Sequence, residues 1–229
     1  MIRDPSAWPR AVVFDLDGTL ADSAGDIRDA LNHAFGLRNQ PPFSLAEVRN
    51  MVGAGLLKLC VRAIEARGAG GVQAADLAAD VIEYYGAHLT AHTVLYEGAA
   101  ALLDRLKGEG RLLGLCTNKR HELTVEVLKE LGIASYFSAV WGEREGFPRK
   151  PDPEPLLGVL ETLGVRPQDA VMVGDGRADI ECAKAAGAVG IAVRYGYAHG
   201  NPDEFGAAAV IDCLADLPDC LAALGAAKQ

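Results

Sequence analysis

Two carboxylates directly follow a short apolar run near the start of the chain, in the sequence Asp15-Leu16-Asp17-Gly18-Thr19. The run itself, residues 11–14, is Val-rich and predicts a strand covered on both faces. Because side chains alternate along a strand, Asp15 and Asp17 are expected on one side, in one pocket. Two like charges about 4 Å apart repel by roughly 4 kcal/mol at an effective dielectric near 20, so the pair indicates a bound cation, a shared proton or a functional role. An acidic turn is the structural alternative, since Asp-Gly-Thr is also good turn chemistry.

Polar residues follow three later apolar runs in the same way. They are Thr117 and Asn118 after residues 112–116, Lys150 in the loop after residues 139–141, and Asp175 and Asp179 after residues 170–173. Each piece alone is weak, because a Thr-Asn pair after a strand usually caps a helix and Gly-Asp-Gly is usually a turn. Open parallel sheets, however, bind ligands beyond the carboxyl ends of their strands. We therefore expect all these side chains to meet Asp15 at one edge of a sheet.

The chemistry that uses such a set is phosphoryl transfer to a carboxylate, because an aspartate can form a covalent aspartyl-phosphate. Asp15 is the candidate nucleophile. Asp17, two residues on, is placed to protonate the leaving oxygen and then to deprotonate the attacking water. An anionic nucleophile that attacks a phosphate needs charge relief, and Mg²⁺ suits a hard-oxygen site with few protein carboxylates. We expect Asp15, the main chain of Asp17, and Asp175 to bind that ion.

Three further side chains complete the expected site. Lys150 supplies positive charge for the transferring oxygens, while the Thr117 hydroxyl and the Asn118 amide supply directional hydrogen bonds to them. Thr117 and Lys150 are thus candidates for both catalysis and substrate binding, and Asn118 for substrate binding. Asp179 lies one helical turn past Asp175 and is expected to orient Lys150 or a metal-bound water from behind.

The elements that must position these residues alternate along most of the chain. The expected strands are residues 11–14, 112–116, 139–141, 170–173 and 189–193, and the expected helices are residues 99–107, 122–131, 154–163 and 178–186. Strands that alternate with helices predict an α/β fold with a doubly wound parallel sheet and right-handed crossovers.

One segment, residues 22–93, interrupts the alternation. It has helical periodicity, and helices are expected at residues 23–37, 44–67 and 74–90. We therefore predict a core domain made of residues 1–21 and 94–229 and an inserted all-helical cap domain, residues 22–93, that acts as a lid. Gly53 and Gly55 either let the backbone approach a substrate or divide the second helix in two.

The composition limits the classes of partner and compartment. Half of the 229 residues are hydrophobic, and the net charge of −9 without a Lys/Arg cluster argues against a nucleic-acid or acidic-membrane partner. A small molecule is the expected ligand. The five cysteines are scattered, and no apolar stretch reaches the ~18 residues of a membrane helix. Any signal peptide would be interrupted by Asp4, Pro5, Pro9 and Arg10. These observations predict a cytoplasmic location. The sequence leaves open whether the chain acts as a monomer or a homodimer.

Taken together, the motifs resemble those of the haloacid dehalogenase-type phosphatases over nearly the whole chain. The matching pieces are Asp-x-Asp-Gly-Thr from residue 15, the strand-end Thr117, the Lys before Pro-Asp-Pro at residue 150, and Gly-Asp-x-x-x-Asp from residue 174. Within that superfamily, Asp17 resembles the second aspartate of phosphatases and phosphomutases, which dehalogenases and phosphonoacetaldehyde hydrolases lack. The resemblance implies a Rossmann-like core, an Mg²⁺-dependent phosphatase and a mobile helical cap that closes over the substrate.

Softer features bear on the substrate. Val52-Gly53-Ala54-Gly55 and Arg194-Tyr195-Gly196-Tyr197 are similar to phosphoglycolate phosphatases, which implies hydrolysis of 2-phosphoglycolate to glycolate and phosphate. The Tyr-Gly-Tyr stretch with His199 also resembles phosphatases of N-acetylmuramic acid 6-phosphate, and a sugar phosphomutase would share the chemistry. A phosphate-binding protein without turnover is the alternative of another class, and the intact aspartates and Lys150 argue against it. Gly176 departs from relatives that carry Ser or Thr there, which removes one hydroxyl near the metal.

Other candidates have a smaller expected role. His88 and His92 are one helical turn apart, a spacing found in zinc sites, but the Glu that metalloproteases carry after the first His is absent, so we assign them to the lid or its hinge. Arg49 and Lys58 flank the glycine loop and are candidates for contact with a substrate carboxylate, although helix charges are usually solvated. Cys116 is interpreted as a small buried apolar residue.

Overall fold

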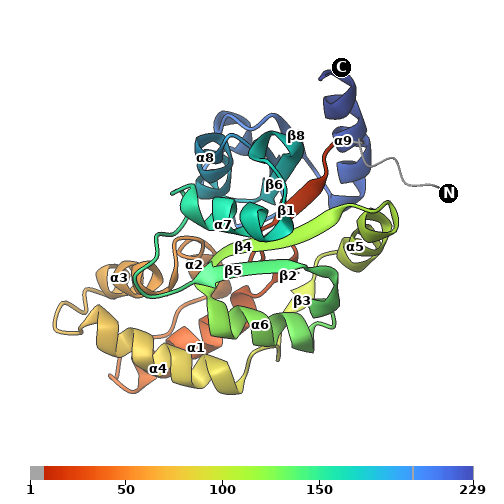
Figure 1. The fold of residues 1–229 in the computed structure, drawn as a ribbon. Helices are drawn as coiled ribbons and strands as arrows, with labels where there is room; N and C mark the ends of the chain where they lie inside the picture. The colour runs from red at the N-terminus through yellow and green to blue at the C-terminus, as the bar shows by residue number, and fades with distance from the viewer. Residues whose placement is uncertain (1–7, 198, 229) are drawn as a thin grey trace.

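A six-stranded parallel sheet with the strand order β5-β4-β1-β6-β7-β8 forms the centre of the computed structural model (Figure 1). The structure describes residues 8–197 and 199–228, so Asp4 and Pro5 lie outside the described residues. The strands are β1 (Ala11–Phe14), β4 (Leu112–Arg120), β5 (Ala139–Glu143), β6 (Ala170–Gly174), β7 (Val189–Val193) and β8 (Ala209–Ile211). The predicted α/β fold with a parallel sheet is confirmed.

Strand β1 lies at the centre of this sheet, hydrogen-bonded to β4 on one side and to β6 on the other. All four of its residues are fully buried. Val12 and Phe14 belong to the larger hydrophobic cluster, whereas Ala11 and Val13 belong to a second cluster on the opposite face. The period-2 alternation of a strand thus supplies apolar contacts to helices on both faces, which fixes the point where Asp15 leaves the sheet.

Helices cover both faces of the sheet. Those outside the inserted segment are α5 (Ala99–Gly108), α6 (His121–Glu130), α7 (Glu154–Leu163), α8 (Arg177–Ala186) and α9 (Leu217–Ala226). Short 3-10 helices span Ala134–Tyr136, Pro167–Asp169, Pro202–Glu204 and Leu214–Asp216. The larger cluster contains buried leucines of α5 and α9, and the second contains those of α7 together with Cys182 of α8. Strand β8 and helix α9 were not predicted from the sequence.

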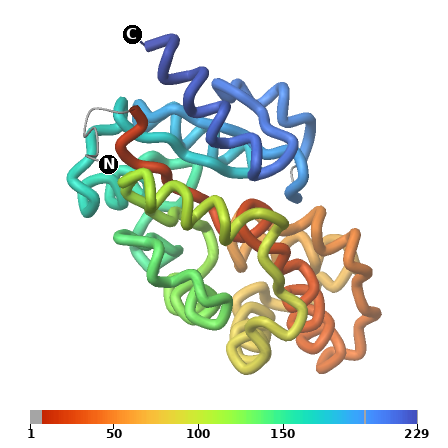
Figure 2. Tube along the Cα trace, turned by 90° about the vertical axis from the view of Figure 1, so that its right-hand side faces the viewer, coloured from red at the N-terminus to blue at the C-terminus, as the bar shows by residue number. Residues whose placement is uncertain are grey.

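The inserted segment lies between two short antiparallel strands, β2 (Ala21–Asp22) and β3 (Val94–Leu95). Its helices are α1 (Ala24–Gly36), α2 (Leu45–Arg49), α3 (Leu56–Arg67) and α4 (Ala74–Ala87). Figure 2 shows these helices, orange to yellow, gathered on one side of the molecule, away from the blue carboxyl-terminal part. The division of the chain into a core and a mobile lid remains a prediction, and the pair β2–β3 is where the chain enters and leaves the helical segment.

Two expected helices of this segment need correction. Residues 44–67 form two helices, because the loop between α2 and α3 contains Gly53 and Gly55 at φ +112° and +86°, backbone angles that favour glycine. Helix α4 ends at Ala87, so His88 and His92 do not lie on consecutive turns of one helix. Among the described residues, no helix is both long and apolar enough to cross a membrane.

Candidate active site

The carboxyl ends of β1, β4 and β6 place the expected site residues at one edge of the sheet. Asp15 leaves β1 with its N–H bonded to the Val173 carbonyl of β6 at 2.9 Å. The side chains that meet at this edge are Asp15, Asp17, Thr117, Asn118, Lys150, Asp175 and Asp179, all of them buried except the half-buried Asp17. The site therefore forms from four segments that are far apart in the sequence, as the strand order of a parallel sheet requires.

Lys150 is the cation at the centre of this group. Its ammonium lies 3.0 Å from Asp15 Oδ1 and 2.6 Å from Asp179 Oδ1, and it donates a hydrogen bond to the Cys116 carbonyl at 2.7 Å. Its side chain is only 1 % exposed. Burial alone would lower the pKa of Lys150, but Asp15 and Asp179 raise it well above its ordinary value, so the ammonium stays charged. The expected contact between Asp179 and Lys150 is present.

The three buried carboxylates Asp15, Asp175 and Asp179 repel one another. Each offers one oxygen within 4.8 Å of the others. Burial raises the pKa of Asp15 to about 6; Lys150 opposes this rise and Asp179 adds to it. Burial, Asp179 and Asp15 likewise raise the pKa of Asp175 well above its ordinary value. Lys150 supplies one positive charge against three carboxylates, so a further cation would stabilise the ionised cluster.

The donor set fits a hard divalent cation such as Mg²⁺. Asp15 Oδ1 is buried and, within the described chain, has no hydrogen-bond partner of good geometry, although Lys150 lies close to it as an ion pair. Both Asp179 oxygens have short partners, Lys150 at 2.6 Å and the Gly176 N–H at 2.9 Å, whereas among the described residues Asp175 Oδ1 has only the Thr19 hydroxyl at 3.3 Å. Carboxylate oxygens are the ligands that Mg²⁺ prefers, and Asp15 and Asp175 are the two of this cluster best placed to bind it, with Asp179 behind them.

Asp175 is held in place from two sides. Its Oδ2 accepts the Tyr197 N–H at 2.7 Å and its Oδ1 accepts the Thr19 hydroxyl at 3.3 Å. Two glycines make room for it, since a Cβ on Gly18 would lie 2.4 Å from Asp175 Oδ2 and a Cβ on Gly196 would lie 2.3 Å from Asp175 Cβ. The backbone around Gly18 therefore lies close to the Asp175 carboxylate, and the main-chain metal ligand from Asp17 stays a prediction.

The side chain of Asp17 takes a different direction from the other carboxylates. It accepts a hydrogen bond from the Ser23 hydroxyl at 2.5 Å and pairs with Lys119, whose ammonium lies 3.1 Å from Oδ1 and 3.2 Å from Oδ2. The same ammonium donates to the Tyr85 hydroxyl at 2.7 Å and lies 4.5 Å from the centre of the Tyr85 ring. Burial would lower the pKa of Lys119, but Asp17 and Tyr85 raise it above its ordinary value. Asp17 thus faces the helical segment, where Tyr85 is located.

Lys119 is the site residue to which sequence reasoning gave no role. The signal was present, because Lys119 lies two residues beyond Thr117, and residues two apart on a strand point to the same side. Thr117 was selected for its hydroxyl, which lowers the pKa of Asp15 through a hydrogen bond. The partner Tyr85 lies on α4, which no local pattern connects with the end of β4.

Asn118 is bonded to protein groups rather than directed into open space. Its Oδ1 accepts the Lys150 N–H at 3.0 Å, and its Nδ2 donates to the Lys150 carbonyl at 3.1 Å and to the Gly53 carbonyl at 3.2 Å. The last of these bonds joins the sheet edge to the helical segment. His199 makes a second bond of this kind, with Nε2 at 2.9 Å from the Val52 carbonyl. The helical segment is therefore closed onto the sheet edge in this structure.

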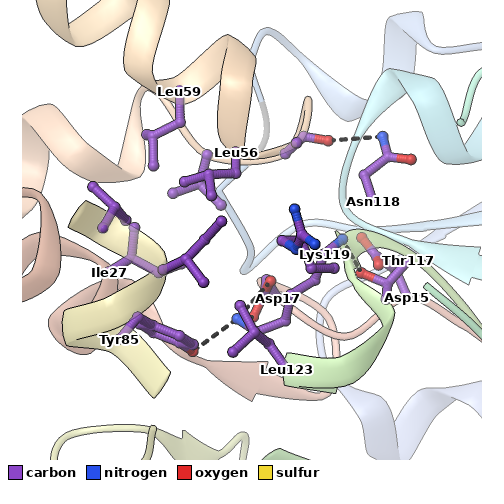
Figure 3. Close-up of a pocket in the computed structure, with 16 residues that line it drawn as sticks. Asp15, Asp17, Ile27, Leu56, Leu59, Tyr85, Thr117, Asn118, Lys119 and Leu123 are labelled. Carbon is purple, nitrogen blue, oxygen red and sulfur yellow. Dashed lines mark hydrogen bonds and ion pairs between the residues drawn. The ribbon is translucent and has the colours of Figure 1, made fainter. Parts of the chain in front are cut away.

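A cavity of about 80 Å³ lies between the two parts. Figure 3 shows Asp15, Asp17, Thr117 and Lys119 on one side of it and Leu56, Leu59, Ile27 and Tyr85 on the other. The acidic and hydroxyl groups thus form one wall, and the facing wall from the helical segment is mostly apolar. The arrangement can hold a compact anion against Asp15 while the apolar wall excludes water.

The sequence pattern of the haloacid dehalogenase-like hydrolase family matches residues 12–193, which include every residue of this cavity and the carboxylate cluster. The chain is a haloacid dehalogenase-like hydrolase.

Several known proteins resemble this haloacid dehalogenase-like hydrolase over most of its length. A phosphoglycolate phosphatase of Rhodospirillum rubrum is 40 % identical over 219 residues, which cover 93 % of this chain and 91 % of that protein. A phosphoglycolate phosphatase of Pseudomonas putida is 38 % identical and covers 94 % of this chain, with 81 % of that protein matched. The crystal structure of a predicted phosphoglycolate phosphatase from Haemophilus somnus superimposes with a TM-score of 0.87 at 28 % identity, covering 92 % of this chain and 97 % of that one.

The remaining candidates lie away from the cavity of this hydrolase. Arg49 pairs with Asp22 at 2.6 Å, and Lys58 is exposed. His88 stacks on Tyr84, and His92 lies 3.1 Å from Asp29, so neither points toward the carboxylate cluster. These placements give the two histidines packing and surface contacts within the helical segment.

Two small residues support the site from behind. Cys116 is fully buried in the second hydrophobic cluster, as expected of a small apolar residue. Gly176 precedes α8 and donates its N–H to Asp179 Oδ2. A Cβ on Gly176 would lie 3.3 Å from the same oxygen. Its lack of a side chain therefore lets the Asp179 carboxylate approach the backbone closely.

Proposed function

We propose that this chain is an Mg²⁺-dependent phosphatase that hydrolyses 2-phosphoglycolate to glycolate and inorganic phosphate through a phosphorylated Asp15. The relatives named above support the substrate, because two proteins matched over 91 % and 81 % of their length, at 40 % and 38 % identity, are phosphoglycolate phosphatases. The single observation that carries the mechanism is the buried Asp15, paired with Lys150 and lacking a hydrogen bond of good geometry at Oδ1 among the described residues.

In the proposed first step, an Asp15 oxygen bonds to phosphorus as the bond from phosphorus to the ester oxygen breaks. Asp17 supplies a proton to the departing glycolate oxygen. In the second step, Asp17 removes a proton from water, and the water oxygen displaces Asp15 and releases inorganic phosphate. Asp15 is regenerated and Asp17 holds a proton again, so the cycle closes.

Electrostatics supports this assignment of roles. Lys150 is fixed beside Asp15 by Asp179 and the Cys116 carbonyl, where its charge would act on the transferring oxygens. Thr117 lines the cavity together with Asp15, and its hydroxyl lowers the pKa of that carboxyl. Mg²⁺, when held by Asp15, Asp175 and the backbone of Asp17, would supply the additional positive charge that a phosphate and a carboxylate need in order to approach each other.

The small cavity favours a compact substrate. Its volume of about 80 Å³ suits a two-carbon ester better than the ring and side groups of an amino-sugar phosphate. The same closure would exclude bulk water from the phosphorylated Asp15 until the cap opens. The five free cysteines are in keeping with an enzyme of the cytoplasm.

A panel of phosphate monoesters with Mg²⁺ tests the proposal. Free phosphate would be measured for 2-phosphoglycolate, N-acetylmuramic acid 6-phosphate, glucose 6-phosphate and glucose 1-phosphate, and the sugar products would be analysed for isomers. The highest specificity constant is expected for 2-phosphoglycolate. A higher value for an amino-sugar phosphate would contradict the substrate assignment, and an isomerised sugar phosphate would indicate a mutase.

A further inference from the structure

The cavity contains one buried cation that the phosphoryl-transfer steps above do not use. Lys119 has a side chain that is 7 % exposed, and its ammonium faces the cavity between Asp17 and Tyr85 (Figure 3). Lys150, in contrast, is bonded to Asp15 and Asp179 behind the cavity wall. A charged lysine next to apolar side chains of the facing wall is costly unless an anion compensates it, and here the compensating group is Asp17.

Asp17 has a second donor that would keep it bonded if Lys119 turned toward another anion. The Ser23 hydroxyl donates to Asp17 Oδ1 at 2.5 Å, independently of Lys119. The Tyr85 hydroxyl accepts from Lys119, and its own proton has no acceptor among the described residues although the residue is only 4 % exposed. Lys119 and Tyr85 thus present an ammonium and an unused O–H donor to the same part of the cavity. Such a pair of donors matches an anionic oxygen acceptor.

The chemistry of the proposed substrate places such an acceptor there. In 2-phosphoglycolate the carboxylate is one methylene away from the ester oxygen that Asp17 would protonate. The group bonded to Asp17 on the side of the helical segment is Lys119. A substrate whose phosphorus lies at Asp15 and whose ester oxygen lies at Asp17 therefore directs its carboxylate toward the Lys119 ammonium.

We propose that Lys119, assisted by the Tyr85 hydroxyl, binds the carboxylate of the substrate and selects carboxylate-bearing phosphate esters over neutral ones. This inference rests on the proposed function and deepens it by naming the group that recognises the part of the substrate that does not react. Arg120 is the competing cation, because it also lines the cavity, but it is 47 % exposed and lies next to Glu122. A half-exposed guanidinium discriminates less than a buried ammonium, since solvent competes for it.

The test compares two esters of nearly equal size. One is 2-phosphoglycolate, and the other is 2-hydroxyethyl phosphate, in which a hydroxymethyl group replaces the carboxylate. The quantity to measure is the ratio of their specificity constants. In Lys119→Met this ratio should fall by about 10- to 150-fold, the factor that corresponds to a lost hydrogen bond between charged groups. Lys119→Arg should retain part of the preference, and Tyr85→Phe should lower it by a smaller factor.

Two control variants separate this role from others. Lys107→Met removes another lysine that lies over a tyrosine ring, that of Tyr136, far from the cavity, and should leave the ratio unchanged. Arg120→Met should also retain most of the preference for 2-phosphoglycolate over 2-hydroxyethyl phosphate. An equal loss for both esters in Lys119→Met would show that Lys119 acts through Asp17 alone, and a collapse of the ratio in Arg120→Met would assign recognition to Arg120. Either result overturns the proposal.

Binding to an inactive variant keeps the test independent of turnover. The dissociation constants of both esters would be measured for Asp15→Asn and for Asp15→Asn combined with Lys119→Met. The single variant should prefer 2-phosphoglycolate, and the double variant should lose that preference. One contrary outcome is that the wild type hydrolyses 2-hydroxyethyl phosphate with the same specificity constant as 2-phosphoglycolate and Asp15→Asn binds both esters equally. In that case the Lys119 proposal fails while the assignment as a phosphatase stands. If the wild type hydrolyses no ester but Asp15→Asn shows the predicted preference, the proposed function fails while the recognition site stands.

Discussion

The Asn118 side chain hydrogen-bonds to the main chain of Lys150, whose ammonium pairs with Asp15 and Asp179. The Asn118 amide makes two bonds with that backbone, one from the Lys150 N–H at 3.0 Å and one to the Lys150 carbonyl at 3.1 Å. The side chain that was expected to bind substrate therefore joins the end of β4 to the loop that carries Lys150. Lys150 belongs to no strand or helix, so this clamp holds the backbone from which its ammonium reaches Asp15 and Asp179.

Asn118→Ala should consequently impair both stability and activity. Two backbone groups of Lys150 would lose their partners, which costs on the order of 2–4 kcal/mol in unfolding free energy. The specificity constant should fall as well, because the ammonium is no longer held at Asp15. Denaturant unfolding and phosphate release would measure the two effects. Asn50→Ala, at an exposed asparagine, is the matched control and should change neither; equal behaviour of the two variants would contradict the clamp.

Asp15→Asn should abolish turnover without harming the fold. The nucleophile is lost, so the rate should fall by at least about 10³-fold. In the metal-free protein the variant should melt at the same or a higher temperature than the wild type, since one of three mutually repelling buried carboxylates becomes neutral. Phosphate release and thermal melting in EDTA would show this. Residual hydrolysis near the wild-type rate would remove Asp15 from the mechanism.

Much of the fold could be predicted because its signals are local. The Val-rich runs and the residues at their ends specified β1, β6 and β7 almost to the residue, and a parallel sheet then brings Asp15 and Asp175 together whatever the rest of the chain does. Strand β8 was not identified because it has three residues, fewer than a period-2 pattern needs to be recognised.

The parts that could not be predicted depend on contacts between distant segments. The bond between Lys119 and Tyr85 joins the end of β4 to a helix of the inserted segment, and neither local sequence indicates the other. The end of α4 before His88 likewise follows from tertiary contacts. Asp26 of α1 accepts the N–H groups of His92 and Thr93, which therefore do not bond within a continued helix. The periodicity of α4 alone does not contain that information.

Metal-free protein should lose stability as the pH rises through the range in which Asp15 ionises. The pKa of Asp15 is about 6 in the fold against 3.8 in an unfolded chain, so between these values the native state binds more protons than the unfolded state. The unfolding free energy therefore falls as pH rises from about 4 to 6, by on the order of 1–3 kcal/mol for this group. The raised pKa of Asp175 acts with the same sign.

Mg²⁺ should reverse this loss, because it binds the ionised carboxylates. Its effect on melting temperature is expected to be larger at pH 7.5 than at pH 5, where protons compete for the same oxygens. Melting curves in EDTA and in excess Mg²⁺ at the two pH values would measure it, and hydrolysis should cease in EDTA. Asp175→Asn should reduce the stabilisation, whereas Asp219→Asn, at an exposed position in α9, should keep it. Equal stabilisation at both pH values, or activity that survives EDTA, would contradict a metal at these aspartates.

Gly196 provides a steric test of how Asp175 is held. The sequence Tyr195-Gly196-Tyr197 was interpreted as a substrate feature, but in the structure it lies against the carboxylate cluster. The Tyr197 N–H donates to Asp175. A Cβ on Gly196 would lie 2.3 Å from Asp175 Cβ and 2.4 Å from the Gly18 carbonyl oxygen. Because one contact is with rigid backbone, Gly196→Ala must displace Asp175 or the Gly18 turn. The unfolding free energy should fall by about 1–3 kcal/mol, the usual cost of overpacking.

The same displacement should remove most of the Mg²⁺-induced stabilisation and of the activity, since Asp175 would leave its position relative to Asp15. Gly108→Ala is the matched control: its Cβ would meet nothing within 4 Å at the end of α5, and it should be neutral or stabilising by up to about 1 kcal/mol. Melting curves with and without Mg²⁺ for both variants separate a local steric effect from a general glycine effect. A Gly196→Ala protein that binds Mg²⁺ and turns over as the wild type does would show that the tyrosine–glycine segment does not fix the position of Asp175.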